Sequence, residues 1–227
     1  IARLSSGKRI TRAHDDASGL SISGRMESQI RGLGMTIKNA KDGQSLVDTQ
    51  EGALQEVSGI LQRMRELAVQ ASSGIAASAD KNFLNTEMAQ LYQEIDAIGA
   101  NTKFNDRNIL TGAAFTFYTD IDVKGVAVTA TALSISGAAL GVGLSSTLVS
   151  IGSTSNNAAI KITISLVDGA IASVAGMRSN LGAISNRFDH IVDNLSNVVA
   201  NTESAKSRIL DADFAVETTQ LTRNTVL

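Results

Sequence analysis

The chain has 227 residues and a net charge of −2, and it contains neither cysteine nor proline. This length allows one or two domains with a sizeable core. The balanced charge, without blocks of like sign, argues against a protein that binds nucleic acid or an anionic membrane. Without cysteine, a disulfide framework and a thiolate metal site are excluded. The absence of proline favours long uninterrupted helices, which proline would break.

Neither a membrane span nor a secretory signal is predicted. No apolar run approaches the roughly 18 residues that a span requires. The charged, apolar and small-residue segments of a cleaved signal peptide are also missing. We therefore expect no membrane insertion. The sequence opens at Ile1 within a patterned segment, so we expect that the natural protein was processed or trimmed.

The N-terminal half carries apolar residues at steps of three and four, which is the pattern of a coiled-coil seam. The seam residues are Leu54, Val57, Leu61, Met64, Ala68 and Ala71, and then Leu84, Met88, Leu91, Ile95 and Ile98. A first helix is predicted from about residue 33 to 72, roughly 60 Å long. A Gly/Ser/Ala-rich break separates it from a second helix, for which Asp80 is the expected N-cap. Such long helices predict an elongated, coiled-coil-like rod.

The C-terminal part repeats the seam pattern without a slip. The seam there comprises Val174, Met177, Leu181, Ile184, Phe188, Ile191, Leu195 and Val198, and its phase continues through Thr202, Ala205 and Ile209. Seven-residue periodicity of this length implies a left-handed supercoil against partner helices. The nearest partners are the two N-terminal helices. We therefore predict a mainly α fold, an elongated antiparallel three-helix bundle closed between distant parts of the chain.

Residues 112–167 differ in character, because they are rich in Gly, Ala, Ser and Thr and carry few charges. Apolar residues alternate with period two, which is typical of short strands. The alternating residues are Phe115, Phe117, Ile121, Val123, Val126, Val128, Ile160, Ile162, Ile164 and Leu166. We predict a small β-rich insert at 112–167 within a discontinuous helical domain of residues 1–111 and 168–227. Asp168 is then the expected cap of the returning helix.

Several segments, in order along the chain, resemble the bacterial flagellins. They are RLSSGKRI (3–10), EGALQEV (51–57), LQRMRELAVQ (61–70), EIDAI (94–98), TKFNDRNIL (102–110), MRSNLGAISNRFDHIVDNL (177–195) and SAKSRILDADFAVE (204–217). The resemblance covers roughly residues 1–111 and 170–225. It also implies further apolar heptads at both ends for polymerisation, which this sequence lacks. The insert resembles nothing that we can place.

The resemblance implies a structural subunit of the flagellar filament, self-assembling for motility, and not an enzyme. It implies other flagellin subunits as partners in a homopolymer, together with an export chaperone and the filament cap. The expected location is the extracellular flagellum, reached through the flagellar type III pathway without a cleaved signal. The alternatives are a cell-surface adhesin or polysaccharide-binding homologue, with surface glycans as partners, and a hook-filament junction protein.

Catalytic, cofactor and metal sites are not expected. His14 lies beside Asp15 and Asp16, but general acid-base catalysis needs a positioned partner, and none is indicated. The two carboxylates are expected to cap backbone amides and pair with cations instead. His190 has no second ligand at a metal-binding spacing.

Three residues flank the seam of the first two helices: Arg63, Leu67 and Glu87 each precede a seam position. From the pattern alone, residues at such positions either widen the core or face solvent. The resemblance implies two other roles for them, as contacts between filament subunits and as the site that a vertebrate Toll-like receptor recognises. We therefore expect all three side chains to be accessible in the isolated chain and buried in the filament.

Overall fold

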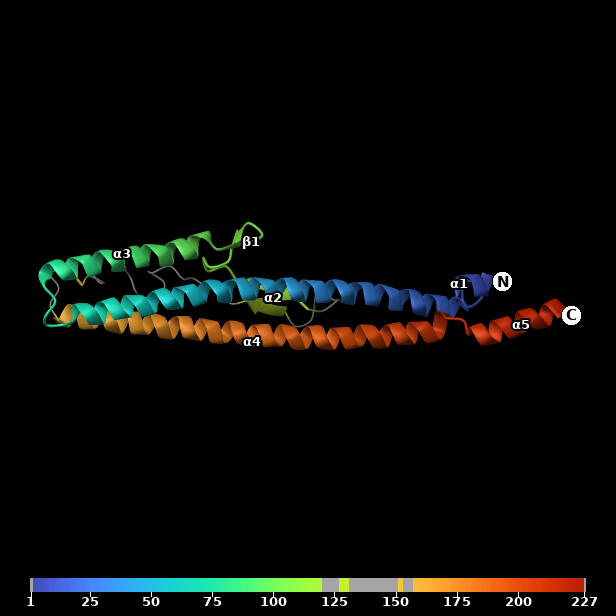
Figure 1. The fold of residues 1–227 in the computed structure, drawn as a ribbon. Helices are drawn as coiled ribbons and strands as arrows, with labels where there is room; N and C mark the ends of the chain where they lie inside the picture. Colours follow the sequence, from blue (N-terminus) through green and yellow to red (C-terminus); the bar gives the residue numbers. More distant parts are fainter. Residues whose placement is uncertain (1, 120–126, 131–150, 153–156, 227) are drawn as a thin grey trace. The chain divides into compact units, whose positions relative to one another are not determined.

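The computed structural model describes residues 2–119, 127–130, 151–152 and 157–226. In chain order the elements are α1 (Ala2–Ser6), α2 (Ala17–Ala71), α3 (Ser78–Asn101), β1 (Lys103–Phe104), β2 (Arg107–Asn108), β3 (Phe115–Tyr118), β4 (Ala127–Ala130), α4 (Asn157–Leu210) and α5 (Phe214–Val226) (Figure 1). The mainly α prediction is confirmed.

The chain divides into two compact units, and α2 and α4 contribute to both. We call them the terminal unit (Ile1–Lys41, Tyr118–Ala127 and Asp189–Leu227) and the central unit (Asp42–Phe117 and Val128–Phe188).

The start of α2 is built by the adjacent pair Asp15 and Asp16. Asp16 Oδ1 accepts the amide of Gly19 at 2.9 Å, and Asp15 Oδ2 accepts the amides of Thr11 and Arg12 at 3.1 Å each. A Cβ at Gly19 would lie 2.4 Å from Asp16 Oδ2, so a larger residue would displace the capping carboxylate. The predicted capping role of the two carboxylates is confirmed. It starts the helix at Ala17, well before the predicted residue 33.

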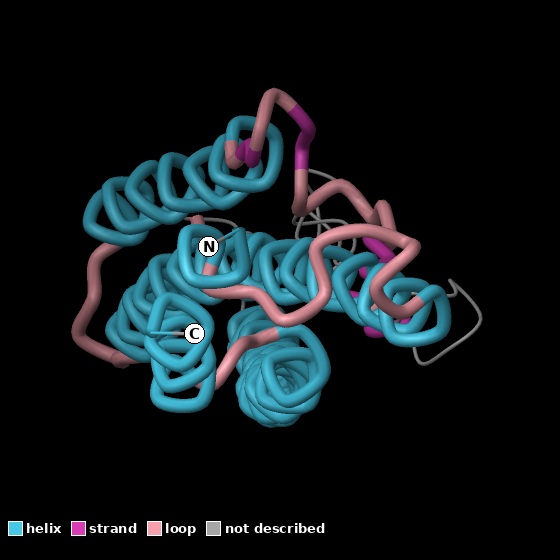
Figure 2. Tube along the Cα trace, turned by 90° about the vertical axis from the view of Figure 1, so that its right-hand side faces the viewer, coloured by secondary structure: helices cyan, strands magenta, loops and turns pink. Residues whose placement is uncertain are grey.

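The central unit buries most of the predicted seam, and Leu84, Leu91, Ile98, Met177 and Ile184 are half-buried. On α2 the six seam residues from Leu54 to Ala71 are fully buried, and Met88 and Ile95 from α3 and Val174, Leu181 and Phe188 from α4 are buried with them. Two ion pairs join α2 to α4, Arg65–Asp168 and Glu51–Arg178. Residue numbers rise on α4 as they fall on α2, so the two helices are antiparallel, and both views show them side by side (Figures 1 and 2).

The prediction for Asp80 is wrong in detail. Helix α3 begins at Ser78, with Ala77 in the N-cap position, so Asp80 lies in the first turn. Its carboxylate still satisfies a free amide, because Oδ2 accepts the N–H of Ala77 at 3.2 Å. An acidic side chain in the first turn is also favoured by the helix dipole.

The predicted strand over residues 160–166 is wrong, because α4 begins at Asn157. The side chains of Ile160, Thr163, Val167, Ala170 and Val174 are buried, and their spacing of three and four is that of a helix. Asp168 therefore lies inside α4 and is not its cap. The division of the chain at 112–167 stays a prediction, although residues 157–167 belong to α4.

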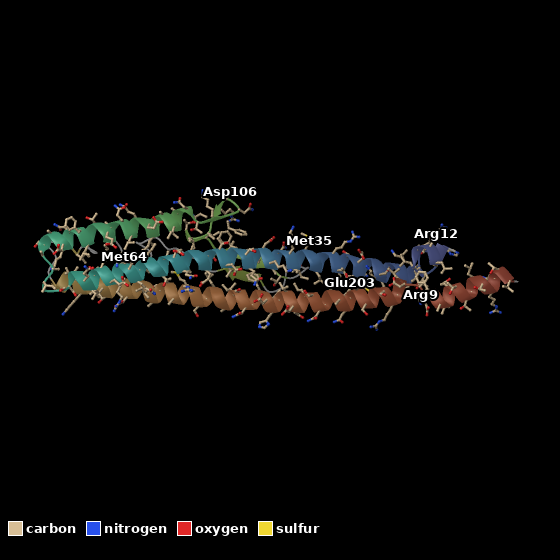
Figure 3. The ribbon with its side chains drawn as sticks, viewed as in Figure 1. Arg9, Arg12, Met35, Met64, Asp106 and Glu203 are labelled. Carbon is tan, nitrogen blue, oxygen red and sulfur yellow. The ribbon has the colours of Figure 1, made fainter. Side chains whose placement is uncertain are left out.

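The described strands form two sheets of two strands each. Strands β1 and β2 are antiparallel, with Lys103 opposite Asn108 and Phe104 opposite Arg107. Asn105 and Asp106 connect them with φ of 49° and 60°, the two positive values that a tight hairpin turn requires; Asp106 lies at the tip (Figure 3). Strand β3 pairs with β4, which confirms the strand prediction at Phe115, Phe117 and Val128. Ile121, Val123 and Val126 lie outside the described residues.

Strand β3 is anchored to the helices by an aromatic contact. The ring of Phe117 meets Phe188 of α4 edge to face, with centroids 5.8 Å apart and planes at 81°. Both rings lie over Gly43 of α2, where an added Cβ would be 2.7 Å from Phe188 Cζ and 3.1 Å from Phe117 Cγ. Further along the chain, the buried Ile151 contacts α3, because its amide donates to Asn85 Oδ1 at 3.1 Å.

The terminal unit joins the two ends of the chain beside the α4–α5 break. The amide of Arg9 donates to the carbonyl of Leu210 at 2.6 Å, and the amide of Ala212 donates to the carbonyl of Gly7 at 3.0 Å. The guanidinium of Arg9 (labelled in Figure 3) reaches the carbonyl of Ile209 at 2.8 Å, which satisfies a free carbonyl at the helix end. The seam is less buried here than in the central unit, and Val198 is exposed.

One helix differs from the expectation about membrane spans. Helix α4 is long and apolar enough to cross a membrane by length and composition alone, with a mean hydropathy of 1.6 in an 18-residue window. A core helix of a soluble protein passes the same test. In the central unit, the α4 seam residues Val174, Leu181 and Phe188 are buried, whereas Met177 and Ile184 are half-buried.

Candidate interaction surface

The central unit presents an ion-pair network on the outside of the α2–α3 pair, centred on Arg63. Its Nε donates to Glu87 Oε1 of α3 at 2.9 Å, and its Nη2 lies 2.8 Å from the same oxygen. Its Nη1 donates to Glu66 Oε2 on its own helix at 3.1 Å. One guanidinium thus bridges the two helices, in the forked geometry that suits arginine and carboxylate.

The network remains open to solvent. The side chains of Arg63 and Glu87 are 49% and 43% exposed. The hydrogen bond to Glu87 and then that to Glu66 raise the pKa of Arg63 above its usual value, so the group is charged at any physiological pH. Because two carboxylates meet one guanidinium, the network carries one more negative group than positive groups.

Leu67 contradicts the expectation that all three flanking side chains are accessible. It is fully buried, together with the neighbouring seam residues Met64 and Ala68. Three residues of this turn of α2 are buried, Met64, Leu67 and Ala68. The helix is linked here to both α3 and α4, through Arg63 and Arg65, so it needs apolar contacts in two directions. Leu67 therefore supports the face from beneath, whereas Arg63 and Glu87 form its surface.

Two exposed apolar residues near this face were missed by the seam pattern. Ile75 lies in the α2–α3 turn and Phe83 on the first turns of α3, and both are strongly exposed. Phe83 immediately precedes the seam residue Leu84, just as Arg63 precedes Met64. That shared position was the signal available in the sequence, because an aromatic residue outside the seam has no core to fill.

The described part of the chain holds no metal-binding cluster. No group of three or more His, Asp or Glu side chains there is arranged to hold a metal ion. His14 is almost fully exposed beside Asp15, whose carboxylate accepts the amides of Thr11 and Arg12. His190 is also exposed on α4.

The sequence matches two family models in order along the chain. Residues 1–114 match the bacterial flagellin N-terminal helical region, and residues 164–227 match the bacterial flagellin C-terminal helical region. The chain belongs to the bacterial flagellins. The flagellin of Halalkalibacterium halodurans is 39% identical over 228 residues, covering 100% of this chain and 82% of that protein. The flagellin of Bacillus subtilis is 36% identical over 255 residues, covering 100% of this chain and 84% of that protein.

Solved structures agree with this assignment. The Bacillus cereus flagellin matches with a TM-score of 0.60 and 31% identity, covering 70% of this chain and 88% of that one. A putative flagellar hook-associated protein of Vibrio parahaemolyticus matches with a TM-score of 0.76 at 15% identity, which shows the shared fold alone. This flagellin is a structural subunit of the extracellular flagellar filament, where it polymerises with other flagellin subunits.

Proposed function

We propose that the face carrying Arg63 and Glu87 is a contact between flagellin subunits in the filament, and that a host Toll-like receptor recognises the same face on free subunits. The observation that carries the proposal is the bridge from Arg63 to Glu87, which fixes α2 to α3 while leaving both side chains about half exposed. A structurally stable but solvent-facing arginine is the kind of residue that anchors protein interfaces.

The role of Leu67 in this proposal is indirect. Since it is buried, it does not contact a partner but holds the α2 backbone that carries Arg63. Substituting Leu67 is therefore expected to weaken the interface through loss of stability, whereas substituting Arg63 or Glu87 removes contacts directly. The proposed role of the whole surface is structural rather than catalytic.

Export and assembly complete the proposal. The subunit leaves the cell through the flagellar type III pathway without a cleaved signal, is held by an export chaperone before export, and is added beneath the filament cap. Family membership supports this route. Mass spectrometry of secreted subunits tests it: an N-terminus shortened by a signal peptidase contradicts the proposed route, and so does continued secretion in cells without the type III apparatus.

Two alternatives are less well supported. A hook-filament junction protein shares the fold, but the curated relatives at 36–39% identity are flagellins. An adhesin or glycan-binding role depends on the insert, and of its aromatic residues Phe115 and Phe117 pack inside the central unit, with only Tyr118 well exposed.

The test of the interface compares two matched ion pairs on α2. Arg63–Glu87 joins α2 to α3, and Arg65–Asp168 joins α2 to α4 with side chains that are 50% and 47% exposed. A double variant Arg63→Ala, Glu87→Ala is expected to lose most receptor activation and filament growth, with helicity unchanged. The double variant Arg65→Ala, Asp168→Ala serves as the control, since it removes a pair of the same type and exposure from another face.

Three readouts decide the result: far-ultraviolet circular dichroism, a receptor reporter assay and filament elongation. Intact filaments of the unaltered protein are expected to be poor agonists compared with subunits. Equal loss in both double variants would mean that the effect comes from stability. Full activity in the Arg63, Glu87 variant would remove these residues from the interface.

A further inference from the structure

The turn between α2 and α3 holds an open apolar pocket of about 420 Å³. It is lined by residues from the end of α2, the turn and the start of α3, including Gln70, Ile75, Asp80, Phe83 and Leu84. The side chains of Ile75 and Phe83 are 95% and 74% exposed. We call this the turn pocket.

Exposed aromatic and branched apolar side chains at one place mark an interaction site more often than isolated ones do. Neither Ile75 nor Phe83 belongs to the core, whereas Ala71 and Met88, nearby along the chain, are buried. Exposing them to water has an energetic cost, which burial against a partner removes.

The turn pocket is continuous with the Arg63–Glu87 face. Phe83 and Glu87 are four residues apart on α3, and Gln70 is seven residues after Arg63 on α2. Residues at these spacings lie on the same side of a helix. An apolar centre beside hydrogen-bonded charges is the usual anatomy of a protein interface.

We propose that the turn pocket is the apolar anchor of the subunit contact, and that its occupant is an apolar side chain of a second copy of this chain. This inference rests on the proposed function of the Arg63–Glu87 face and deepens it. A second copy is the favoured occupant because the chain belongs to a family that polymerises with itself. A head-to-tail polymer requires every subunit to present a patch that a different patch of the next subunit covers.

The charges near the pocket favour an apolar and uncharged occupant. Arg63 is already paired with Glu66 and Glu87. The carboxylate of Asp80 already accepts the amide of Ala77. These charged groups therefore already have protein partners, whereas Ile75 and Phe83 are largely uncovered and would meet an aliphatic or aromatic side chain.

The experiment uses filaments grown by cells whose flagellin carries this sequence, with a photo-activated cross-linking amino acid in place of Phe83. Illumination is expected to join position 83 to a second flagellin chain, and peptide mass spectrometry identifies the partner residue. The matched control places the same cross-linker at Ala89, which is exposed on α3 but is separated from Phe83 by about 120° around the helix. Capture of a host receptor, the cap or a chaperone instead of flagellin would overturn the proposal.

A substitution series separates this inference from the proposed function. Phe83→Ser is expected to slow filament elongation about tenfold or more, as loss of an aromatic anchor does, with unchanged helicity. The control is Ile162→Ser, which removes an exposed apolar residue from α4. Normal elongation of Phe83→Ser overturns the inference. If Arg63→Ala, Glu87→Ala is then impaired, the proposed function stands alone. If Phe83→Ser is impaired and Arg63→Ala, Glu87→Ala is not, the turn pocket is the contact and the ion pair is not.

Discussion

Adding one methyl group at Gly43 tests how tightly the β3 anchor packs on the helices. The Cβ of an alanine would lie 2.7 Å from Phe188 Cζ and 3.1 Å from Phe117 Cγ. Those distances force one or both rings to move, and overpacking of this kind costs about 1–3 kcal/mol. Alanine also favours the helix over glycine by about 1 kcal/mol. The expected net effect is a loss of up to about 2 kcal/mol in the free energy of unfolding.

The matched control is Gly59→Ala on the same helix. No atom beyond the local helix backbone and the adjoining residues lies within 4 Å of a Cβ built at Gly59, so only the helix preference acts, and stability should rise by about 0.5–1 kcal/mol. The helix contribution cancels between the two variants. They should therefore differ by the packing cost of about 1–3 kcal/mol, or roughly 2–12 °C in melting temperature for a chain of this size.

Thermal unfolding followed by circular dichroism at 222 nm measures the difference. In a Phe188→Leu background, Gly43→Ala should cost less, because leucine does not place a ring edge at the new methyl group. The reasoning is refuted if Gly43→Ala and Gly59→Ala raise the melting temperature equally. That outcome would mean that the Phe117–Phe188 pair does not pack against α2 at Gly43.

Three further predictions concern single residues. Leu67→Ala should lower the free energy of unfolding by about 2–5 kcal/mol because it leaves a buried cavity. The control Val69→Ala, at a half-exposed position on the same helix, should change it by about 0.5 kcal/mol or less. Equal effects of the two variants in chemical denaturation would contradict the buried position of Leu67. Asp106→Gly should stabilise the β1–β2 hairpin by up to about 1 kcal/mol, since φ of 60° suits glycine, and a lower melting temperature would show a different turn. Lys206 lowers the pKa of Glu27 below its ordinary 4.5, so the ion pair stabilises the fold above that pH and the contribution is lost as pH falls through the lowered pKa. Glu27→Gln should therefore reduce the fall in melting temperature at acid pH. An unchanged fall would assign the acid sensitivity to other carboxylates.

The sequence alone determined the helical architecture of this flagellin. A seam at steps of three and four specifies which side of each helix is apolar, and only packing against another helix can bury such a stripe. The predicted seam positions Leu54, Leu61, Val174 and Phe188 are all buried. The family followed from sequence as well, because motifs such as LQRMRELAVQ were sufficient without any coordinates.

The prediction from local pattern was wrong at residues 160–166, where the apolar residues fit both the two-residue period of a strand and the spacing of a helix. Ile160, Ile162, Ile164 and Leu166 alternate as a strand would, yet this segment is the start of α4. The same stretch also contains Thr163 and Val167 at helical spacing from Ile160, and short apolar segments satisfy both patterns. Long-range packing decided the outcome, because Ile160, Thr163 and Val167 are buried at helical spacing and Asp168 pairs with Arg65 of α2.

Tertiary structure alone decided which flanking residues face solvent. Arg63, Leu67 and Phe83 each lie one residue before a seam position, so the seam pattern does not distinguish them. Leu67 became core because α2 packs against two helices at that level, whereas Arg63 found a partner in Glu87 across the α2–α3 pair and Phe83 found none beneath it. Periodicity fixes the direction of a side chain around its own helix, but burial depends on the neighbours that a chain's distant segments place there.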